Sequence, residues 1–211
     1  MHLRRAGAVL VLVALVTASG CTQLLLQDET SFVASEANVS DAGAVGFAHN
    51  ESRWQNVTRT VEAAGQEREV TVSNHAEVFL NRSSDGTPTA AFVVVSTPQV
   101  EAGGEELNPV ADWSQRDLLR TFSTEFDEYG NFTDVQERET REVRLLGTDA
   151  NMRVFNATLA DEAASDQEVV ASVVRVKHEG DYVVAIGVRG LNGTDIGTGE
   201  TREALVSRVE H

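Results

Sequence analysis

The sequence predicts an α+β domain around a largely antiparallel sheet of about seven to eight strands, with one long central helix, a short N-terminal helix and a C-terminal helix. Two observations favour this class. Apolar and polar residues alternate at every second position along most of the chain, as in strands that bury one face. One segment, 112–129, instead carries apolar residues at helical spacing. Since neither an internal repeat nor a second core is evident, we expect residues 31–211 to form a single domain.

The alternation locates the first strands. We expect a short strand over 32–37 and paired strands over 54–63 and 69–80, joined by a turn at 64–66. The segment 90–96 is apolar at consecutive positions, which predicts a central strand covered on both faces. In the strand over 69–80, one face carries the apolar residues Val70, Val72, Ala76, Val78 and Leu80, and the other carries Thr71, Ser73, His75 and Glu77.

Helical segments interrupt the strands. Ser40 is a candidate cap for a short helix over 40–47. The helix over 112–129 follows Asn108-Pro109 and can be capped by Asp112 with Gln115 or by Ser114 with Asp117. Its expected buried stripe is Leu118, Leu119, Phe122, Phe126 and Tyr129. The rest of the chain predicts strands over 132–146, 151–160, 168–178 and 181–189 and a final helix over 200–210.

Residues 1–20 have the pattern of a signal peptide, and Cys21 directly follows them as the only cysteine of the chain. Arg4-Arg5 precedes an apolar stretch that ends in the small residues 18–20. This stretch is too short to span a membrane, at roughly 21 Å as a helix against about 30 Å of hydrocarbon. We expect cleavage before Cys21, lipidation of Cys21 and a polar tether over 21–30. An ordinary secretory peptide or a retained anchor is the alternative, and both Sec and twin-arginine export are open.

The composition suits a location at the extracytoplasmic face of a cell membrane in high salt. Cleavage would remove two of the 17 basic residues and no acid, which leaves 15 basic and 33 acidic residues and a formal charge of −18. Lys177 is the only lysine. An acidic, lysine-poor surface keeps a protein hydrated in very high salt, so we interpret the chain as halophilic. The same charge argues against nucleic-acid binding, which needs a basic patch.

Seven asparagines begin N-x-S/T motifs, which are acceptors for glycosylation in exported proteins. Turn chemistry also brings Asn and Ser or Thr together, and this explanation suits Asn81 and Asn192 better than Asn56. We expect glycans on some of these sites. The candidates are Asn38, Asn50, Asn56, Asn81, Asn131, Asn156 and Asn192.

Several segments resemble those of an uncharacterised family, a domain of unknown function found in haloarchaeal secreted lipoproteins. They are 93–101 (VVVSTPQVE), 107–112 (LNPVAD), 70–74 (VTVSN) and 37–42 (ANVSDA). The resemblance covers about 31–211 and implies a location and an architecture but no catalytic residue. The order of elements is also loosely similar to the PsbP-like fold, whose members often act as accessory factors for membrane complexes.

The sequence carries no complete catalytic or metal-binding motif, so we expect no catalytic residue, metal or cofactor. His75 and Glu77 lie on one polar strand face, where a solvated surface pair is the simpler interpretation than a site. The other histidines, His49, His178 and His211, are scattered in the sequence without ligand-like spacing. An acidic group could hold calcium weakly but is better explained as a solvated loop; it comprises Asp161, Glu162, Asp166 and Glu168.

The function these features favour is a membrane-anchored, non-enzymatic binding or accessory module. It would bind the membrane through a lipid on Cys21 and an unknown protein or small ligand through its folded domain. Trp54, on a strand face, is the better exposed candidate for a partner contact, whereas Trp113 near a helix start suits the core. The alternatives are a structural, glycosylated envelope protein and an envelope hydrolase. A hydrolase would require residues such as Ser96 or His75 to meet acids in a cleft.

Overall fold

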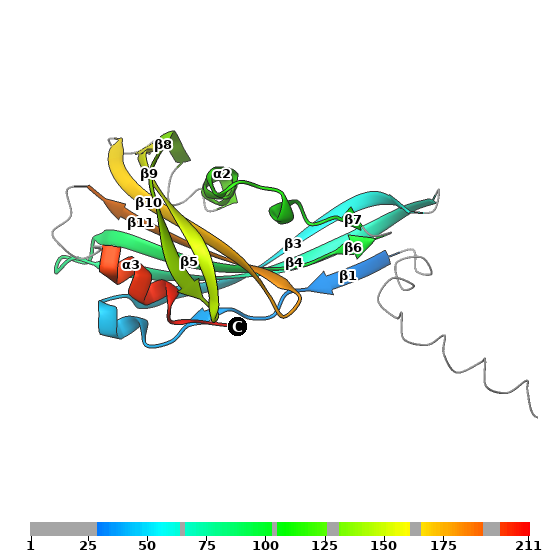
Figure 1. Ribbon diagram of the computed structural model, residues 1–211, viewed down its shortest axis with the longest axis horizontal. Coiled ribbons are helices and arrows are strands. Elements are labelled where there is room, and N and C mark those ends of the chain that lie inside the picture. The colour runs from blue at the N-terminus through cyan, green and yellow to red at the C-terminus, as the bar shows by residue number, and fades with distance from the viewer. Residues whose placement is uncertain (1–28, 64–65, 103–104, 126–130, 161–165, 192–198) are drawn as a thin grey trace, which may run out of the picture.

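One eight-stranded sheet forms most of the structure (Figure 1), a computed structural model that describes residues 29–63, 66–102, 105–125, 131–160, 166–191 and 199–211. Its strands follow the order β1-β4-β5-β11-β10-β9-β8, and β3 pairs with β4 as well. They are β1 (Glu29–Val33), β3 (Ala48–Ala63), β4 (Gln66–Arg82), β5 (Pro88–Pro98), β8 (Asn131–Leu145), β9 (Thr148–Ala160), β10 (Gln167–His178) and β11 (Asp181–Gly190).

The strand β4 organises the sheet because it pairs with three other strands. β3 runs antiparallel along one edge of it. The other edge is divided between β1, which pairs in parallel with residues 69–73, and β5, which pairs antiparallel with residues 75–82. The other neighbours in the sheet, from β5 through to β8, are antiparallel. The hairpin of β3 and β4 therefore extends beyond the rest of the sheet as an arm, with β1 beside it (Figure 1).

The predicted α+β class with a long central helix is wrong. Strands make up 66% of the structure and helices 15%, and the described residues hold two α-helices beside one large mixed sheet. These are α2 (Gln115–Glu125) and α3 (Gly199–Val206). The loose similarity to the PsbP-like fold belonged to the same prediction and is wrong together with it. The reason is that strand alternation persists over 15 to 17 residues in β3, β4 and β8, whereas the helical spacing covers only a few turns.

The helical segments are shorter than predicted. The segment expected as an N-terminal helix forms only a 3-10 turn, η1 (Ala42–Val45), and Ser40 donates a side-chain hydrogen bond to the carbonyl of Arg208 instead of capping it. The capping pair Ser114 and Asp117 is confirmed: the backbone N–H of Asp117 donates to Ser114 Oγ, and that of Ser114 donates to Asp117. Residues 126–129 of the predicted long helix lie outside the described residues.

The predicted strands agree better with the structure. Those expected over 54–63, 69–80, 90–96, 151–160, 168–178 and 181–189 lie within β3, β4, β5, β9, β10 and β11. The strand expected over 132–146 is β8, which ends one residue earlier. The strand predicted over 32–37 is displaced, because β1 ends at Val33. Two short pairs complete the fold: β2 (Asn38–Val39) with β12 (Val209–Glu210), and β6 (Glu101–Ala102) with β7 (Glu105–Glu106).

Each face of the sheet is covered by a different part of the chain. The 3-10 turn η2 (Pro109–Ala111) and α2 lie over one face, where Leu118 and Leu119 pack against the side chains of β9, β10 and β11. On the opposite face, η1, the β2–β12 pair and α3 cover a larger core that includes Phe79, Phe92 and Val183 (Figure 1). The sheet is therefore the central layer of three. None of the described helices is long and apolar enough to span a bilayer.

Candidate functional site

A groove of about 490 Å³ lies between the sheet and the segment that leads into α2. Its floor is formed by side chains of β3, β4 and β5, and its roof by η2, Trp113 and the residues Thr121 and Phe122 of α2. The volume falls within the range of small-molecule sites, about 300–1,000 Å³. The apolar part of the lining is Val57, Val70, Val72, Ala76, Val95, Val100, Leu107, Pro109, Val110, Trp113 and Phe122.

The local sequence explains why the groove stays open on one side. β3 is the outermost strand of the arm and α2 does not extend over it, so Val57 is 36% exposed although it lies on the same face as Val72. The two strands are in register, with Val57 opposite Val72. The neighbours of Val57 on this face of β3 are Arg53, Gln55 and Arg59, so the open side of the groove joins apolar side chains to basic ones. Apolar surface that no other element covers indicates a binding site.

Two asparagines in the lining differ in their hydrogen bonds. Asn108 is fully used: its Nδ2 donates to Thr97 Oγ1 and to the carbonyl of Pro98, both at 2.7 Å, and its Oδ1 accepts from the N–H of Val110 at 3.0 Å. Asn74 Oδ1, by contrast, is buried and accepts no hydrogen bond within the structure. Buried polar atoms are nearly always paired, so this oxygen in an apolar groove indicates a missing donor.

The two tryptophans lie where the sequence suggested. Trp54 is 49% exposed, and its ring centroid is 4.7 Å from that of His75, its partner in register on the face of the sheet opposite Val57 and Val72. Trp113 is partly buried against the core beneath α2 and also lines the groove. Of the two indole rings, that of Trp113 therefore borders the cavity, whereas that of Trp54 lies on the opposite face of β3.

His75 and Glu77 do not form the solvated surface pair that we expected. They are only 2% and 7% exposed, because the segment 34–47 covers their face of β4. The Glu77 carboxylate contacts His49 Nε2 at 2.6 Å and His75 Nε2 at 3.3 Å, and it accepts a hydrogen bond from Ser52. The carboxylate is thus fully engaged by its neighbours, which is typical of a structural network.

A second polar cluster joins Ser96, Asp181 and His211. Ser96 Oγ lies 3.0 Å from both Asp181 Oδ2 and His211 Nε2, and His211 Nε2 lies 2.9 Å from Asp181 Oδ2. A catalytic triad places the serine and the acid on different nitrogens of the histidine. Here the same nitrogen faces both, and Ser96 is fully buried, so the cluster has neither the relay geometry nor the access of a nucleophilic site.

The comparison with known protein families gives one result. Residues 36–210 match a family model described as Domain of unknown function (DUF6517). The chain belongs to this family. The expectation of an uncharacterised family is therefore confirmed. None of the curated proteins matches the chain.

The predicted glycosylation sites differ in their exposure. Five are exposed: Asn38, Asn50, Asn56, Asn131 and Asn156. Asn81 is 4% exposed; its Nδ2, the atom that would carry a glycan, donates a 2.6 Å hydrogen bond to the carbonyl of Gly46, and its Oδ1 accepts from Thr89. Asn81 is therefore a structural residue of strand β4, and its hydrogen bonds are not those of the turn that we offered as the alternative explanation.

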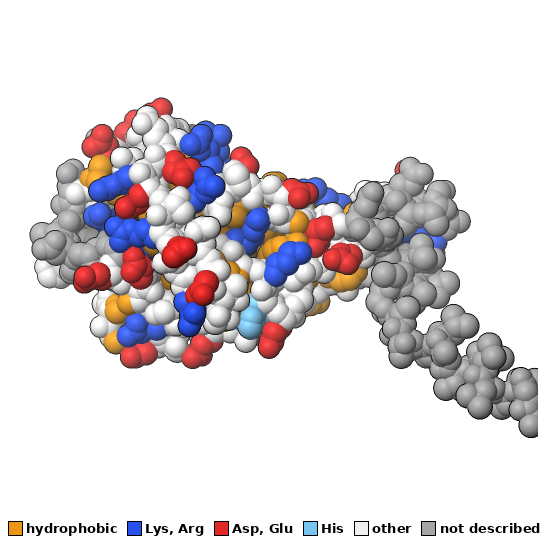
Figure 2. Space-filling model, in the orientation of Figure 1, with side chains coloured by type: hydrophobic (Ala, Val, Ile, Leu, Met, Phe, Trp, Pro, Cys, Tyr) orange, Lys and Arg blue, Asp and Glu red, His pale blue; other side chains and the backbone are white. Residues whose placement is uncertain are grey.

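Other predicted residues lie outside the described part of the chain, namely Cys21, Asn192, Asp161 and Glu162. The other two members of the acidic group, Asp166 and Glu168, are exposed. On the face shown in Figure 2, arginine side chains are interspersed with acidic ones and form no continuous basic patch.

Sequence reasoning missed the groove as a whole. Its floor combines alternate residues of three strands and its roof comes from 107–122, so only the pairing of the strands brings the lining together. The one signal available in advance was the apolar face of β4, which includes Val70, Val72 and Ala76 of the lining.

Proposed function

We propose that this protein is an extracytoplasmic binding module, held at the membrane by a lipid on Cys21, whose groove takes a small apolar molecule that carries a hydrogen-bond donor. The observation that supports this most strongly is the buried, unpartnered Asn74 Oδ1 within a groove lined mainly by apolar side chains. An apolar chain would cover the exposed face of Val57 and Val72, and a hydroxyl or amide group of the ligand would donate to Asn74.

The position of the groove suits a ligand that comes from the membrane. β1 begins at Glu29, and Thr30 and Phe32 pair in register with Val70 and Val72 of the groove floor. Seven residues lie between Cys21 and Glu29, and the eight steps from one to the other span at most about 29 Å of extended chain. A lipid on Cys21 would therefore keep the groove close to the bilayer. The strongly acidic composition and the family resemblance support a haloarchaeal, halophilic setting for this location.

A glycosylated structural role in the envelope is the second candidate. It is favoured by the five exposed acceptor asparagines, of which Asn50 and Asn56 lie on the edge strand β3 and Asn131 on the edge strand β8. Glycans there would hinder other chains from pairing with the open edges of the sheet. This role is compatible with ligand binding, because the acceptors Asn50 and Asn56 do not line the groove.

The test is a titration with 1-dodecanol, followed by the fluorescence of Trp113, which lines the groove. Binding in the groove predicts a saturable spectral change. Asn74→Leu should weaken the affinity roughly five- to tenfold, because one hydrogen bond contributes about 1 kcal/mol. Val57→Glu should abolish binding, since it places a charge on the exposed part of the floor.

Thr58→Glu is the matched control. It adds the same charge to an exposed position one residue further along β3, where the side chain points to the opposite face of the sheet. This variant should bind as tightly as the wild type. Equal losses in the Val57 and Thr58 variants, or a dodecanol signal that never saturates, would contradict binding in the groove.

A further inference from the structure

Two histidines that are far apart in the sequence meet beside the turn between β10 and β11. His178 is the last residue of β10, and Glu179 and Gly180 form the turn. His211 comes much later in the sequence, directly after β12. The rings of His178 and His211 are in edge-to-face contact with centroids 5.4 Å apart. Our expectation that these histidines are scattered without pairing is therefore wrong, because β12 returns the chain to this turn.

The two imidazoles and the Glu179 carboxylate form a group of possible metal ligands. One ligand atom from each residue lies within 4.8 Å of the others, and His178 Nε2 is 4.0 Å from Glu179 Oε1. Within the described residues, this is the one group of at least three such side chains with that spacing.

The hydrogen bonds of His211 show which of its nitrogens is available. Its side chain has no exposed surface, and Nε2 faces Asp181 Oδ2 at 2.9 Å. Asp181 is itself held in place by the N–H of Ser35 at 2.7 Å and by Ser96 Oγ at 3.0 Å. A proton on Nε2 is therefore donated to the carboxylate, which leaves a lone pair on Nδ1. Nδ1 is buried and has no hydrogen-bond partner in the structure.

We propose that His178, Glu179 and His211 bind a divalent transition-metal ion of the Zn²⁺ class, with Asp181 orienting His211 from behind. A metal-bound histidine almost always donates its other ring N–H to a carboxylate or carbonyl, and Asp181 supplies that partner. The ion would be the missing partner of His211 Nδ1. Two imidazoles and one carboxylate suit Zn²⁺ and leave one coordination position for water or a further ligand.

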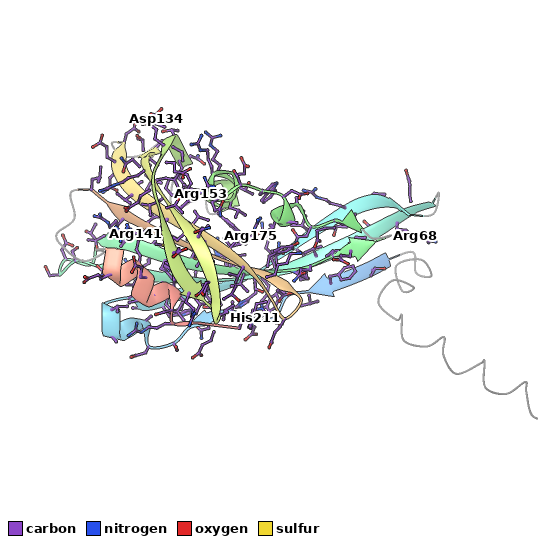
Figure 3. The ribbon with its side chains drawn as sticks, in the orientation of Figure 1. Arg68, Asp134, Arg141, Arg153, Arg175 and His211 are labelled. Carbon is purple, nitrogen blue, oxygen red and sulfur yellow. The ribbon has the colours of Figure 1, made fainter. Side chains whose placement is uncertain are left out.

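Binding of the ion requires the side chains of the site to rotate towards one another. Metal–ligand bonds of about 2.0–2.2 Å require the three ligand atoms to approach one another more closely than they do here. The side chain of Glu179 is 72% exposed and that of His178 is 27% exposed, so both have room to rotate, while His211 stays fixed by Asp181. Figure 3 shows His211 below the sheet, on the opposite side from α2, so this site is separate from the groove.

The experiment titrates the full chain, stripped with a chelator, with ZnCl₂ in a calorimeter and in thermal unfolding. We expect one Zn²⁺ per chain with micromolar or tighter affinity and a higher Tm. His178→Ala should weaken binding at least tenfold, and Glu179→Gln should weaken it by a smaller factor. Asp181→Asn should cost 10- to 100-fold through the orientation of His211. Asp181 is buried, and its variant can fail to fold. The decisive variants are therefore those of the two more exposed ligands, His178 and Glu179.

His49→Ala is the control, because His49 belongs to the separate network around Glu77. It should leave the affinity for Zn²⁺ unchanged. The proposal is overturned if no saturable binding occurs below about 100 µM, if His178→Ala and Glu179→Gln both bind as the wild type does, or if His49→Ala removes the ion as completely as His178→Ala. A Co²⁺ spectrum of tetrahedral type that disappears in His178→Ala would support it independently.

Discussion

Arg175 of β10 donates a 3.0 Å hydrogen bond to the carbonyl of Trp113, and the same guanidinium also donates to the carbonyl of Val110. These two carbonyls belong to the chain that forms the roof of the groove. Arg175 thus fastens the roof to the sheet from below, in the region where η2 leads towards α2 (Figure 3). The groove depends on this contact because its floor and roof come from separate parts of the chain.

Arg175→Gln should therefore loosen the roof. We expect a loss of about 1–3 kcal/mol in the free energy of unfolding, the usual cost of breaking charge-assisted hydrogen bonds that leave carbonyls unpaired. Dodecanol affinity should fall in parallel. Arg153→Gln on the neighbouring strand is the control, because its exposed ion pair with Glu137 contributes at most about 1 kcal/mol. Equal effects of the two variants in urea denaturation would show that Arg175 has no special role.

Tyr182 gives the structure a specific dependence on alkaline pH. Burial raises the pKa of its phenol above the usual value of 10.0, and the hydrogen bond to Glu106 Oε2, at 2.8 Å, raises it further against the opposing effect of Lys177. Because the folded state holds this proton more tightly than the unfolded state, the stabilisation is fully present below about pH 10. It is lost as the pH rises through the folded-state pKa.

Tyr182→Phe should cost about 1–2 kcal/mol at neutral pH, through the lost hydrogen bond to a charged group. The difference in stability between wild type and variant should then shrink above about pH 10. Urea denaturation at several pH values measures this difference. A difference that stays constant up to pH 11 would contradict the assignment of the proton to Tyr182.

Arg202 of α3 is buried without a partner for its Nε and one of its terminal nitrogens. Burial lowers the pKa of this guanidinium, and the nearby charges of Arg189 and Arg141 lower it further. An unpaired buried charge is costly, so Arg202→Met should stabilise the fold by about 1–3 kcal/mol. Arg144→Met, at an exposed position on β8, should leave the Tm nearly unchanged. A lower Tm for Arg202→Met would show that the guanidinium has a partner that binds it.

The strands could be predicted from the sequence because each carries its own alternation, independent of its neighbours. Burial of the second face could not. His75 and Glu77 occupy alternate positions, as residues of a solvent-facing strand face do, yet the chain from Ala34 to Phe47 covers them. No pattern in the sequence around His75 and Glu77 predicts that this segment packs over them. The meeting of Ser96, Asp181 and His211 likewise depends on the return of β12 to β2. The prediction of a long central helix was wrong because it gave too much weight to a few apolar residues at helical spacing. The alternation of the neighbouring segments, which is typical of strands, extends over many more residues.

Glycan mapping tests how far the fold limits modification. We expect glycans on exposed acceptors such as Asn156 and none on Asn81, whose Nδ2 is bound to the carbonyl of Gly46. Asn156→Gln should lower the mass of the exported protein by one glycan, whereas Asn81→Gln should leave its glycan mass unchanged. Because Asn81 is buried, its replacement should also lower the Tm, which Asn156→Gln should not do. A glycopeptide that contains Asn81 would contradict the structural role of this residue.

The most direct test of the binding function is native mass spectrometry of the protein extracted from its own membranes in mild detergent. We predict a chain cut before Cys21 that carries a covalent lipid and retains one small apolar molecule. That molecule should be absent from Val57→Glu and present in Thr58→Glu. A wild-type chain that carries no retained molecule, or one that both variants keep equally, would contradict the proposal that the groove is the binding site.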